Sequence, residues 1–209
     1  MSLYTNYAQN KITDWRWRGQ TLTPPATNYI GMIVATKNLS GSIRSAAVLS
    51  GDTVLPQTPN GRIYKCTTAG TTGAGEPTWP TTNGGTVTDG TAVWTEQTTA
   101  MLAGTFTEAT YGSYARISIA SSLANFAGTQ GATTTVASSG TSAQTSNNTA
   151  LAFPAPTSGS GTAFGWFSSD ASSAGNIWEF GADTTPLAFS SGGSAPTYAI
   201  SQLVLTAAL

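Results

Sequence analysis

Acidic side chains come closest to a catalytic set in this sequence. A glycosidase needs two carboxylates that face each other across the scissile bond. Folding could pair Asp89 with Glu96, or Asp170 with Glu179, but nothing in either spacing requires it. Asp89 precedes a glycine in a dipeptide typical of tight turns. We therefore expect Asp89 and Asp170 to lie in turns, and we predict no hydrolytic site.

Histidine is absent, and Cys66 is the one cysteine. The absence of histidine removes the commonest general base, the commonest zinc ligand and the Ser-His-Asp triad. A single cysteine cannot form a disulfide within the chain. The acidic residues show no calcium-loop spacing, and the many serines and threonines have no histidine or nearby lysine to activate them. We expect no catalytic residue, no metal, no cofactor and no enzymatic activity.

Three aromatic residues, Tyr64, Trp79 and Trp94, fall within about thirty residues rich in Gly, Thr and Pro. Aromatic rings stack on the apolar faces of sugars, so the set is a candidate for contact with a glycan or a protein partner. Alternatively, the rings form the small core of their own module, which the sequence favours for Tyr64 and Trp94. Trp79 lies in a loop between Pro77 and Pro80, and both interpretations remain open for it.

Trp15, Arg16, Trp17 and Arg18 form a second candidate group at the end of a predicted helix. Cations at a helix C-terminus interact favourably with the helix dipole. Two tryptophans beside two arginines would also suit a contact between subunits. The sequence leaves both interpretations open.

That helix is expected over residues 2–18, with Ser2 as its cap. Tyr4, Ala8, Ile12 and Trp15 recur at steps of four, four and three, which places them on one apolar stripe. Gly19 and the prolines after it end the helix. We expect the stripe to dock on a sheet or on a neighbouring subunit.

The remaining segments indicate strands. A continuous apolar run covers residues 29–36, an alternating run covers 113–120, and aromatic-rich runs cover 162–168 and 176–180. Residues 133–137 and 198–206 are also strand-like. Many short strands separated by turn residues predict an all-β fold with a β-sandwich or jelly-roll-like core and one N-terminal α-helix.

Residues 51–99 are predicted to form a small inserted β-module. Strands are expected at 62–67 and 91–95, with turn dipeptides between them at Asn83-Gly84 and Asp89-Gly90. The predicted organisation is therefore a core made of residues 1–50 plus 100–209, interrupted by this module.

Charge is scarce, since 8% of the residues are Asp, Glu, Lys or Arg, against about 25% in ordinary soluble domains. A surface this poor in charge suits a permanent assembly, or an extracellular β-protein rich in Ser and Thr. Net charge is −1 with no basic run, so we expect no nucleic acid partner. The sequence shows no signal peptide and no membrane helix. We expect synthesis in the host cytoplasm and release by lysis or within a particle.

Several segments resemble a family of tailed-bacteriophage virion proteins, often labelled tail fibre-like or minor structural proteins. They are YTNYAQNKITDWRWRG with the following NYIGMIVAT, the segment YGSYARISI, and the strand–turn–strand FGWFSSDASSAGNIWEFG. The resemblance covers roughly residues 2–36 and 104–206. It implies a structural protein of the virion and carries no catalytic residues.

The segment NGRIYKCTTAGTTGAGEPTWPTTNGGTVTDGTAVW resembles a small module of phage virion proteins and, loosely, carbohydrate-binding modules. The resemblance implies a module that projects from the virion, without implying that this copy binds sugar.

Three functions follow as hypotheses. The first is a non-catalytic virion structural protein, a head decoration or cement protein or a tail component, that assembles with other virion proteins and with itself as a homotrimer. The second is a tail fibre or receptor-binding protein that attaches to host surface glycans through the module. The third, a depolymerase with paired carboxylates, lacks support in the residues.

Overall fold

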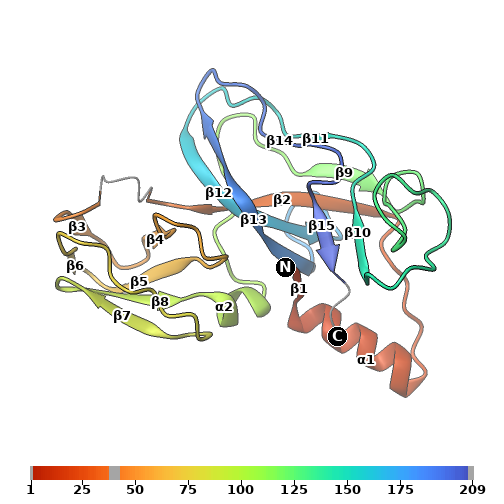
Figure 1. Ribbon diagram of the computed structural model, residues 1–209, viewed down its shortest axis with the longest axis horizontal. Coiled ribbons are helices and arrows are strands. Elements are labelled where there is room, and N and C mark those ends of the chain that lie inside the picture. Colours follow the sequence, from red (N-terminus) through yellow and green to blue (C-terminus); the bar gives the residue numbers. More distant parts are fainter. Residues whose placement is uncertain (1, 38–42, 207–209) are drawn as a thin grey trace.

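A five-stranded antiparallel sheet forms the centre of the protein. Its strands, in spatial order, are β1 (Ser2–Tyr4), β13 (Ile177–Ser190), β12 (Ser160–Ser169), β2 (Thr27–Ala35) and β9 (Ile117–Ala120). The structure is a computed structural model that describes residues 2–37 and 43–206 (Figure 1). Every pairing in this sheet is antiparallel.

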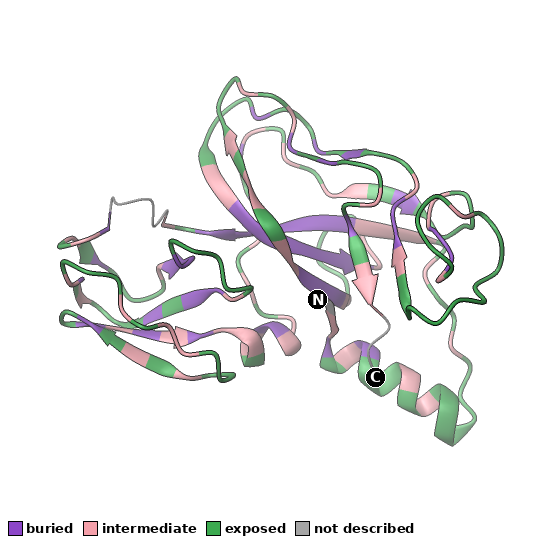
Figure 2. Cartoon of the chain, viewed as in Figure 1, coloured by how far each residue is buried: buried purple, intermediate pink, exposed green. Residues whose placement is uncertain are grey.

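Both faces of this sheet are buried, which explains the continuous apolar run in β2. Ile30, Met32 and Val34 point to one face, whereas Ile33 and Ala35 point to the other. Because side chains alternate along a strand, a strand covered on both sides is apolar throughout. The buried colour of Figure 2 accordingly runs along the centre of the sheet, and the loops around it are mainly exposed.

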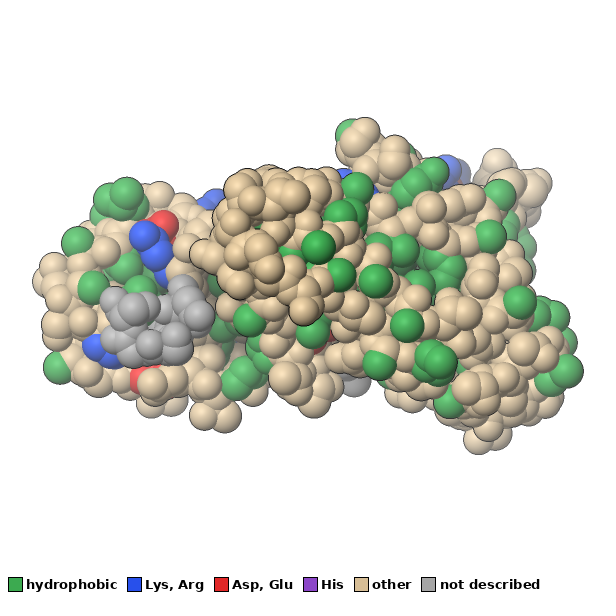
Figure 3. Space-filling model, turned by 90° about the horizontal axis from the view of Figure 1, so that it is seen from above, with side chains coloured by type: hydrophobic (Ala, Val, Ile, Leu, Met, Phe, Trp, Pro, Cys, Tyr) green, Lys and Arg blue, Asp and Glu red, His purple; other side chains and the backbone are tan. Residues whose placement is uncertain are grey.

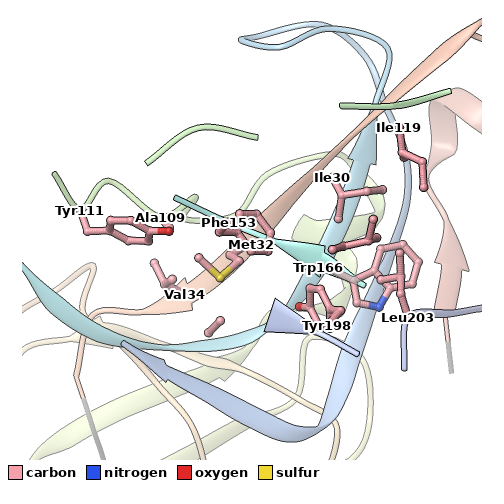
Figure 4. Packing of buried hydrophobic residues seen from close by; sticks show 12 residues of the cluster. Ile30, Met32, Val34, Ala109, Tyr111, Ile119, Phe153, Trp166, Tyr198 and Leu203 are labelled. Atoms are coloured by element: carbon pink, nitrogen blue, oxygen red, sulfur yellow. The ribbon is translucent and has the colours of Figure 1, made fainter. Parts of the chain in front are cut away.

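On one face, the sheet is covered by two short ribbons and the loops that carry them. Strands β10 (Gln144–Ser146) and β15 (Val204–Thr206) form one ribbon, and β11 (Leu151–Ala152) and β14 (Thr197–Tyr198) form the other. Figure 4 shows residues of the ribbon layer, among them Phe153, Tyr198 and Leu203, packed with residues of β2 and β12. The two layers together enclose the larger part of the core.

The module lies to one side of the central sheet, at the left in Figure 1. Its four-stranded sheet has the order β4-β5-β8-β7, and a separate two-stranded ribbon pairs β3 with β6. The bounds are β3 (Ala47–Val48), β4 (Thr53–Val54), β5 (Tyr64–Thr68), β6 (Gly70–Thr71), β7 (Thr86–Asp89) and β8 (Ala92–Glu96). A short helix, α2 (Thr98–Leu102), follows β8.

The opposite face of the central sheet packs against the module side of the molecule. Leu55 and Ile63 from the module and Met101 from α2 are buried in one cluster with Phe167 and Phe180 of the sheet. Ile43 and the β3 strand also belong with the module, since Ile43 is buried in the module's own cluster. The division into residues 51–99 and the rest of the chain stays a prediction.

Two glycines of the central sheet lie where an aromatic ring of the neighbouring strand comes close to the backbone. Gly31 lies opposite Phe167, and Gly181 lies opposite Trp166, in neighbouring strands. A Cβ atom added at Gly31 would stand 2.2 Å from the ring of Phe167, and one at Gly181 would stand 2.9 Å from the Trp166 ring. Each glycine therefore leaves room for an aromatic ring to lie across the neighbouring strand.

The prediction of an all-β fold with one N-terminal helix is confirmed, because the described chain consists mostly of strands in antiparallel sheets. The start of the helix was predicted wrongly. Helix α1 covers Asn6–Arg18, and residues 2–4 form the edge strand β1 instead. The hydroxyl of Thr5, not Ser2, accepts the capping bond from the Ala8 amide at 3.4 Å. Pairing of residues 2–4 with β13 prevails over their place in the apolar stripe.

Three strand predictions were also wrong in part or in full. In the 113–120 segment only Ile117–Ala120 is a strand, because Ser113 has a φ of 70° and the Tyr114 amide closes a turn on Tyr111. Residues 133–137 form no strand, and Thr133 has a φ of 63°. The last segment is divided into β14 and β15 by a turn around Ser201, whose φ is 65°. Backbone in this left-handed region interrupts strand pairing.

Candidate functional site

The three aromatic residues of the module do lie together. Tyr64 is on β5 and Trp94 on β8, and both side chains are fully buried. The ring of Trp79 lies 4.4 Å from that of Tyr64 and 6.1 Å from that of Trp94, measured between centroids. Tyr64 and Trp94 are therefore the centre of the module core, which is the interpretation that the sequence favoured for these two rings.

Trp79 is the member of the set that keeps partly exposed surface. Its indole N–H donates to Glu76 Oε1 at 2.7 Å, and the same oxygen accepts from the Gln57 amide at 2.7 Å. One side of the ring packs on Tyr64, whose hydroxyl donates to the Pro80 carbonyl at 2.8 Å. The loop thus holds the indole in a fixed orientation, with part of its surface exposed to solvent.

The carboxylates of the module are engaged in ion pairs. Asp89 is buried and lies 3.0 Å from Arg44, while Glu96 is buried and lies 2.9 Å from Arg62. Asp89 pairs with Ala92 next to the β7–β8 turn, whereas Glu96 lies at the other end of β8. The register therefore separates the two carboxylates along the hairpin.

Asp170 and Glu179, the second acidic pair that the sequence suggested, have different surroundings in the structure. Asp170 accepts from the amide and the side chain of Asn176, each at 2.8 Å, and so closes the turn between β12 and β13. These bonds, which favour the charged form, lower the pKa of Asp170 although its partial burial acts in the opposite sense. Glu179 is buried in β13, opposite Ser168 of β12.

The end of α1 is the most exposed aromatic surface in the described chain. Trp15 is 51% exposed and Trp17 is 75% exposed. The guanidinium of Arg16 lies 5.2 Å from the centroid of the Trp17 ring, and Arg18 forms an ion pair with Asp14 at 2.8 Å. Of the residues in α1, only Ala8 is buried. The structure thus leaves this group available to a partner.

An ion pair that the sequence did not single out organises the core. Glu108 accepts two bonds from Arg116, each at 2.8 Å, and one from the Tyr114 hydroxyl at 3.0 Å. Arg116 also donates to the carbonyls of Ala171 and Ala174 at 2.8 Å, in the turn between β12 and β13. We call these three side chains the Glu108 clamp. The clamp joins the segment before β9 to the far end of the central hairpin.

Two hollows flank the segment that carries the clamp. The larger, of about 600 Å³, is lined by Glu108, Tyr111, Phe189 and several hydroxyl side chains. The smaller, of about 360 Å³, lies beside Tyr114 and Arg116. Of the two aromatic residues that line the larger hollow, Tyr111 is almost fully buried and Phe189 is partly exposed.

Within residues 2–37 and 43–206, no three His, Cys, Asp or Glu side chains are grouped so that they could hold a metal ion. Neither described helix is long and apolar enough to cross a membrane. Cys66 is buried in the module, and burial raises the pKa of its thiol.

The protein is thus an all-β protein with ion-paired or turn-forming carboxylates and with exposed tryptophans at the end of α1. Comparison with known families identifies the family to which the chain belongs. Residues 80–206, more than half of the chain, match the podophage GP4 fiber I protein gp80 family, and the chain belongs to it. No curated protein matches the sequence.

The match confirms the expectation of a phage virion protein with tail fibre-like character. It includes the segment 104–206 on which much of the expected resemblance rested, and it begins inside the module at Pro80. It therefore includes Trp94, but neither Tyr64 nor Trp79. The likeness of the module to carbohydrate-binding modules stays a prediction.

Proposed function

We propose that this phage fibre-family protein is a non-catalytic structural component at the surface of the virion. It would assemble with other virion proteins, either in the tail or as a head decoration, after synthesis in the host cytoplasm. The observation that carries the proposal is the family match, which includes most of the central sheet and the layer that covers it. The engagement of Asp89, Glu96 and Asp170 in ion pairs and turns supports a role without catalysis.

Contacts between subunits are part of this proposal. The exposed tryptophans and arginines at the end of α1, residues 15–18, would bury their apolar surface against a neighbouring virion subunit. Aromatic and arginine side chains are the types most enriched in the energetic centres of interfaces. We propose that the protein also associates with itself, as a homotrimer.

Electron microscopy of purified particles tests the location. Gold-tagged antibody to this protein should label the particle surface. Label confined to the tail or its tip would identify a fibre or baseplate component, and label over the capsid would identify a decoration protein. Particles without label, from a preparation in which the antibody recognises the purified protein, would overturn the proposal.

Glycan binding through Trp79 is the second candidate function. The partly exposed indole, held in place by Glu76 and Tyr64, is the observation that favours it. A preoriented aromatic ring is suited to stacking on a sugar, because little rotational freedom is lost on binding. The module would then present this ring to a glycan on the host surface.

Calorimetric titration with host-derived glycans tests this second function. We expect Trp79→Ala to abolish binding while Trp17→Ala, at an exposed tryptophan outside the module, leaves it unchanged. Circular dichroism and thermal unfolding would show that Trp79→Ala keeps its fold despite losing the contact with Tyr64. No heat of binding at millimolar glycan, or equal loss in both variants, would exclude a glycan site at Trp79.

A further inference from the structure

The C-terminal part of the described chain, residues 117–206, carries no exposed charged side chain. In residues 117–206 the charged residues are Asp170, Glu179 and Asp183, and none of them belongs to the exposed class. The other charged residues lie in α1, in the segments of residues 37–96 and in the Glu108 clamp. A soluble monomer usually keeps charges distributed over its surface to prevent association.

Large apolar side chains are exposed in the same part of the chain. Leu123 is 53% exposed, Val136 60%, Ile200 53% and Val204 40%. Outside this part, the exposed large hydrophobic residues of the described chain are the two tryptophans of α1 and Leu49 of the module. Scattered apolar residues are common on surfaces, whereas a group of them without intervening charge marks a contact surface.

Two asparagines hold the segments that carry these four residues together. Asn148 donates to the carbonyls of Leu123 and Thr134 at 3.4 and 3.0 Å, close to Leu123 and Val136 in the chain. Asn147 donates to the Ala199 carbonyl at 2.8 Å and accepts from the Leu203 amide at 2.9 Å, on either side of Ile200. Asn147 is fully buried. The segments are therefore fixed around one point, which favours a preformed surface.

We call the exposed face of residues 122–148 and 199–206 the uncharged surface. Figure 3 shows charged side chains over the module at the left, while the near side of the right-hand part is almost entirely apolar or neutral and polar. The exposed cations Lys11, Arg16 and Arg18 of α1 and Lys65 of the module lie outside the uncharged surface.

We propose that the uncharged surface is where copies of this chain pack against one another. A partner that placed a charge against this surface would have to bury it without a counter-charge, which is costly. The matching partner must itself be uncharged at the contact. A second copy of this chain meets this condition, because its own uncharged surface carries no Asp, Glu, Lys or Arg. The inference deepens the self-assembly in the proposed function and names the surface that carries it.

This surface predicts a distinct dependence on salt. Contacts without charge are not screened by ions, so the association should not weaken when ionic strength rises. A contact through Arg16 and Arg18 of α1 would instead weaken if it relied on acidic groups of the partner. Salt therefore distinguishes the two candidate surfaces.

Sedimentation equilibrium of the purified full chain tests the proposal. We expect the wild-type chain to associate, with a dissociation constant that does not rise between about 0.05 and 0.5 M NaCl. The double variant Leu123→Glu, Ile200→Glu places charges in two exposed turns and should raise the dissociation constant at least about tenfold. Leu49→Glu is the control, because Leu49, at 68%, is even more exposed than Leu123 and Ile200 but lies on the module, and it should leave association unchanged.

Each other outcome has a separate meaning. A wild-type chain that stays monomeric, or a double variant that associates as well as the control, would overturn the inference. Dissociation by Trp17→Glu alone would move the self-contact to α1. Gold labelling of the virion is independent of these results, so a monomeric chain that labels the particle would leave the virion role intact.

Discussion

The three side chains of the Glu108 clamp connect parts of the chain that are distant in sequence. Glu108 lies before β9, Arg116 leads into β9, and the carbonyls that Arg116 binds belong to the turn after β12. The guanidinium also lies 4.8 Å from the centroid of the Phe167 ring. This network explains in physical terms why the Tyr-Ala-Arg segment around Tyr114 and Arg116 is not an ordinary strand.

Glu108→Gln should destabilise the protein by about 2–4 kcal/mol, because Arg116 is mostly buried and would lose its counter-charge. Urea-induced unfolding followed by tryptophan fluorescence measures the loss. Asp14→Asn is the control, since it removes the exposed pair with Arg18 and should cost about 0.5 kcal/mol or less. Equal effects of the two variants would mean that the clamp does not stabilise the fold.

A second residue pair makes the stability depend on pH. Burial raises the pKa of Asp183 to about 7, and a bond from the Tyr198 hydroxyl at 3.0 Å only partly offsets this. A carboxyl with a raised pKa binds its proton more tightly in the folded state. Its stabilising contribution is therefore full below about pH 4, its unfolded pKa, and is lost as pH rises through about 7.

The free energy of unfolding of the wild type should accordingly fall by about 2–4 kcal/mol, relative to Asp183→Asn, between about pH 4 and pH 8. Asparagine keeps an acceptor for Tyr198 and cannot ionise, so the variant serves as the reference. Urea titrations of both proteins at several pH values give the difference. Parallel pH profiles would show that Asp183 does not titrate in this window.

At the scale of the elements, the sequence predicts a strand well where packing alone decides it. The continuous apolar run of β2 and the aromatic runs of β12 and β13 are covered on both faces, and the bounds of β2 and β12 and the start of β13 agree with the prediction within two residues. The strand β13 continues to Ser190, beyond its aromatic part, because it pairs with β12 past a bulge next to Gly165. Composition does not reveal that pairing.

Elements whose position depends on contacts with residues far away in the sequence could not be predicted. Residues 2–4 join the central sheet through β13, which lies more than 170 residues away in the chain. Glu108 was not selected from the sequence because neither its neighbours nor its spacing distinguishes it, and its partners become evident only when the turn after β12 is placed. The sequence favoured a buried position for Tyr64 and Trp94, which the structure shows, but it left the position of Trp79 open, because the packing of its loop on Tyr64 is not visible in the sequence.

The module and the central sheet should unfold together. Leu55 and Met101 are buried against the sheet in one cluster, so their loss affects both parts. Leu55→Ala and Met101→Ala should each cost about 2–5 kcal/mol and preserve one calorimetric transition. Val87→Ala, at a partly buried residue inside the module, is the control with a smaller expected loss. Two transitions in the wild type would instead support residues 51–99 as an independent domain.

At the scale of the whole molecule, charged and neutral surface belong to different elements. The module and α1 carry the exposed cations, while the layer of β10, β11, β14 and β15 presents hydroxyls, amides and apolar groups. For a fibre-family protein, this division would direct the uncharged layer toward its own copies, and the module and α1 toward other partners.

The same distribution has a consequence for digestion. Arg116 is the last basic residue of the sequence, so trypsin has no peptide bond to cleave anywhere beyond it. The uncharged surface therefore lies entirely on a segment that this protease leaves whole, even when the chain is unfolded. Enzymes that cut after lysine or arginine can trim the module and α1, but they cannot fragment the layer through which the copies are proposed to meet.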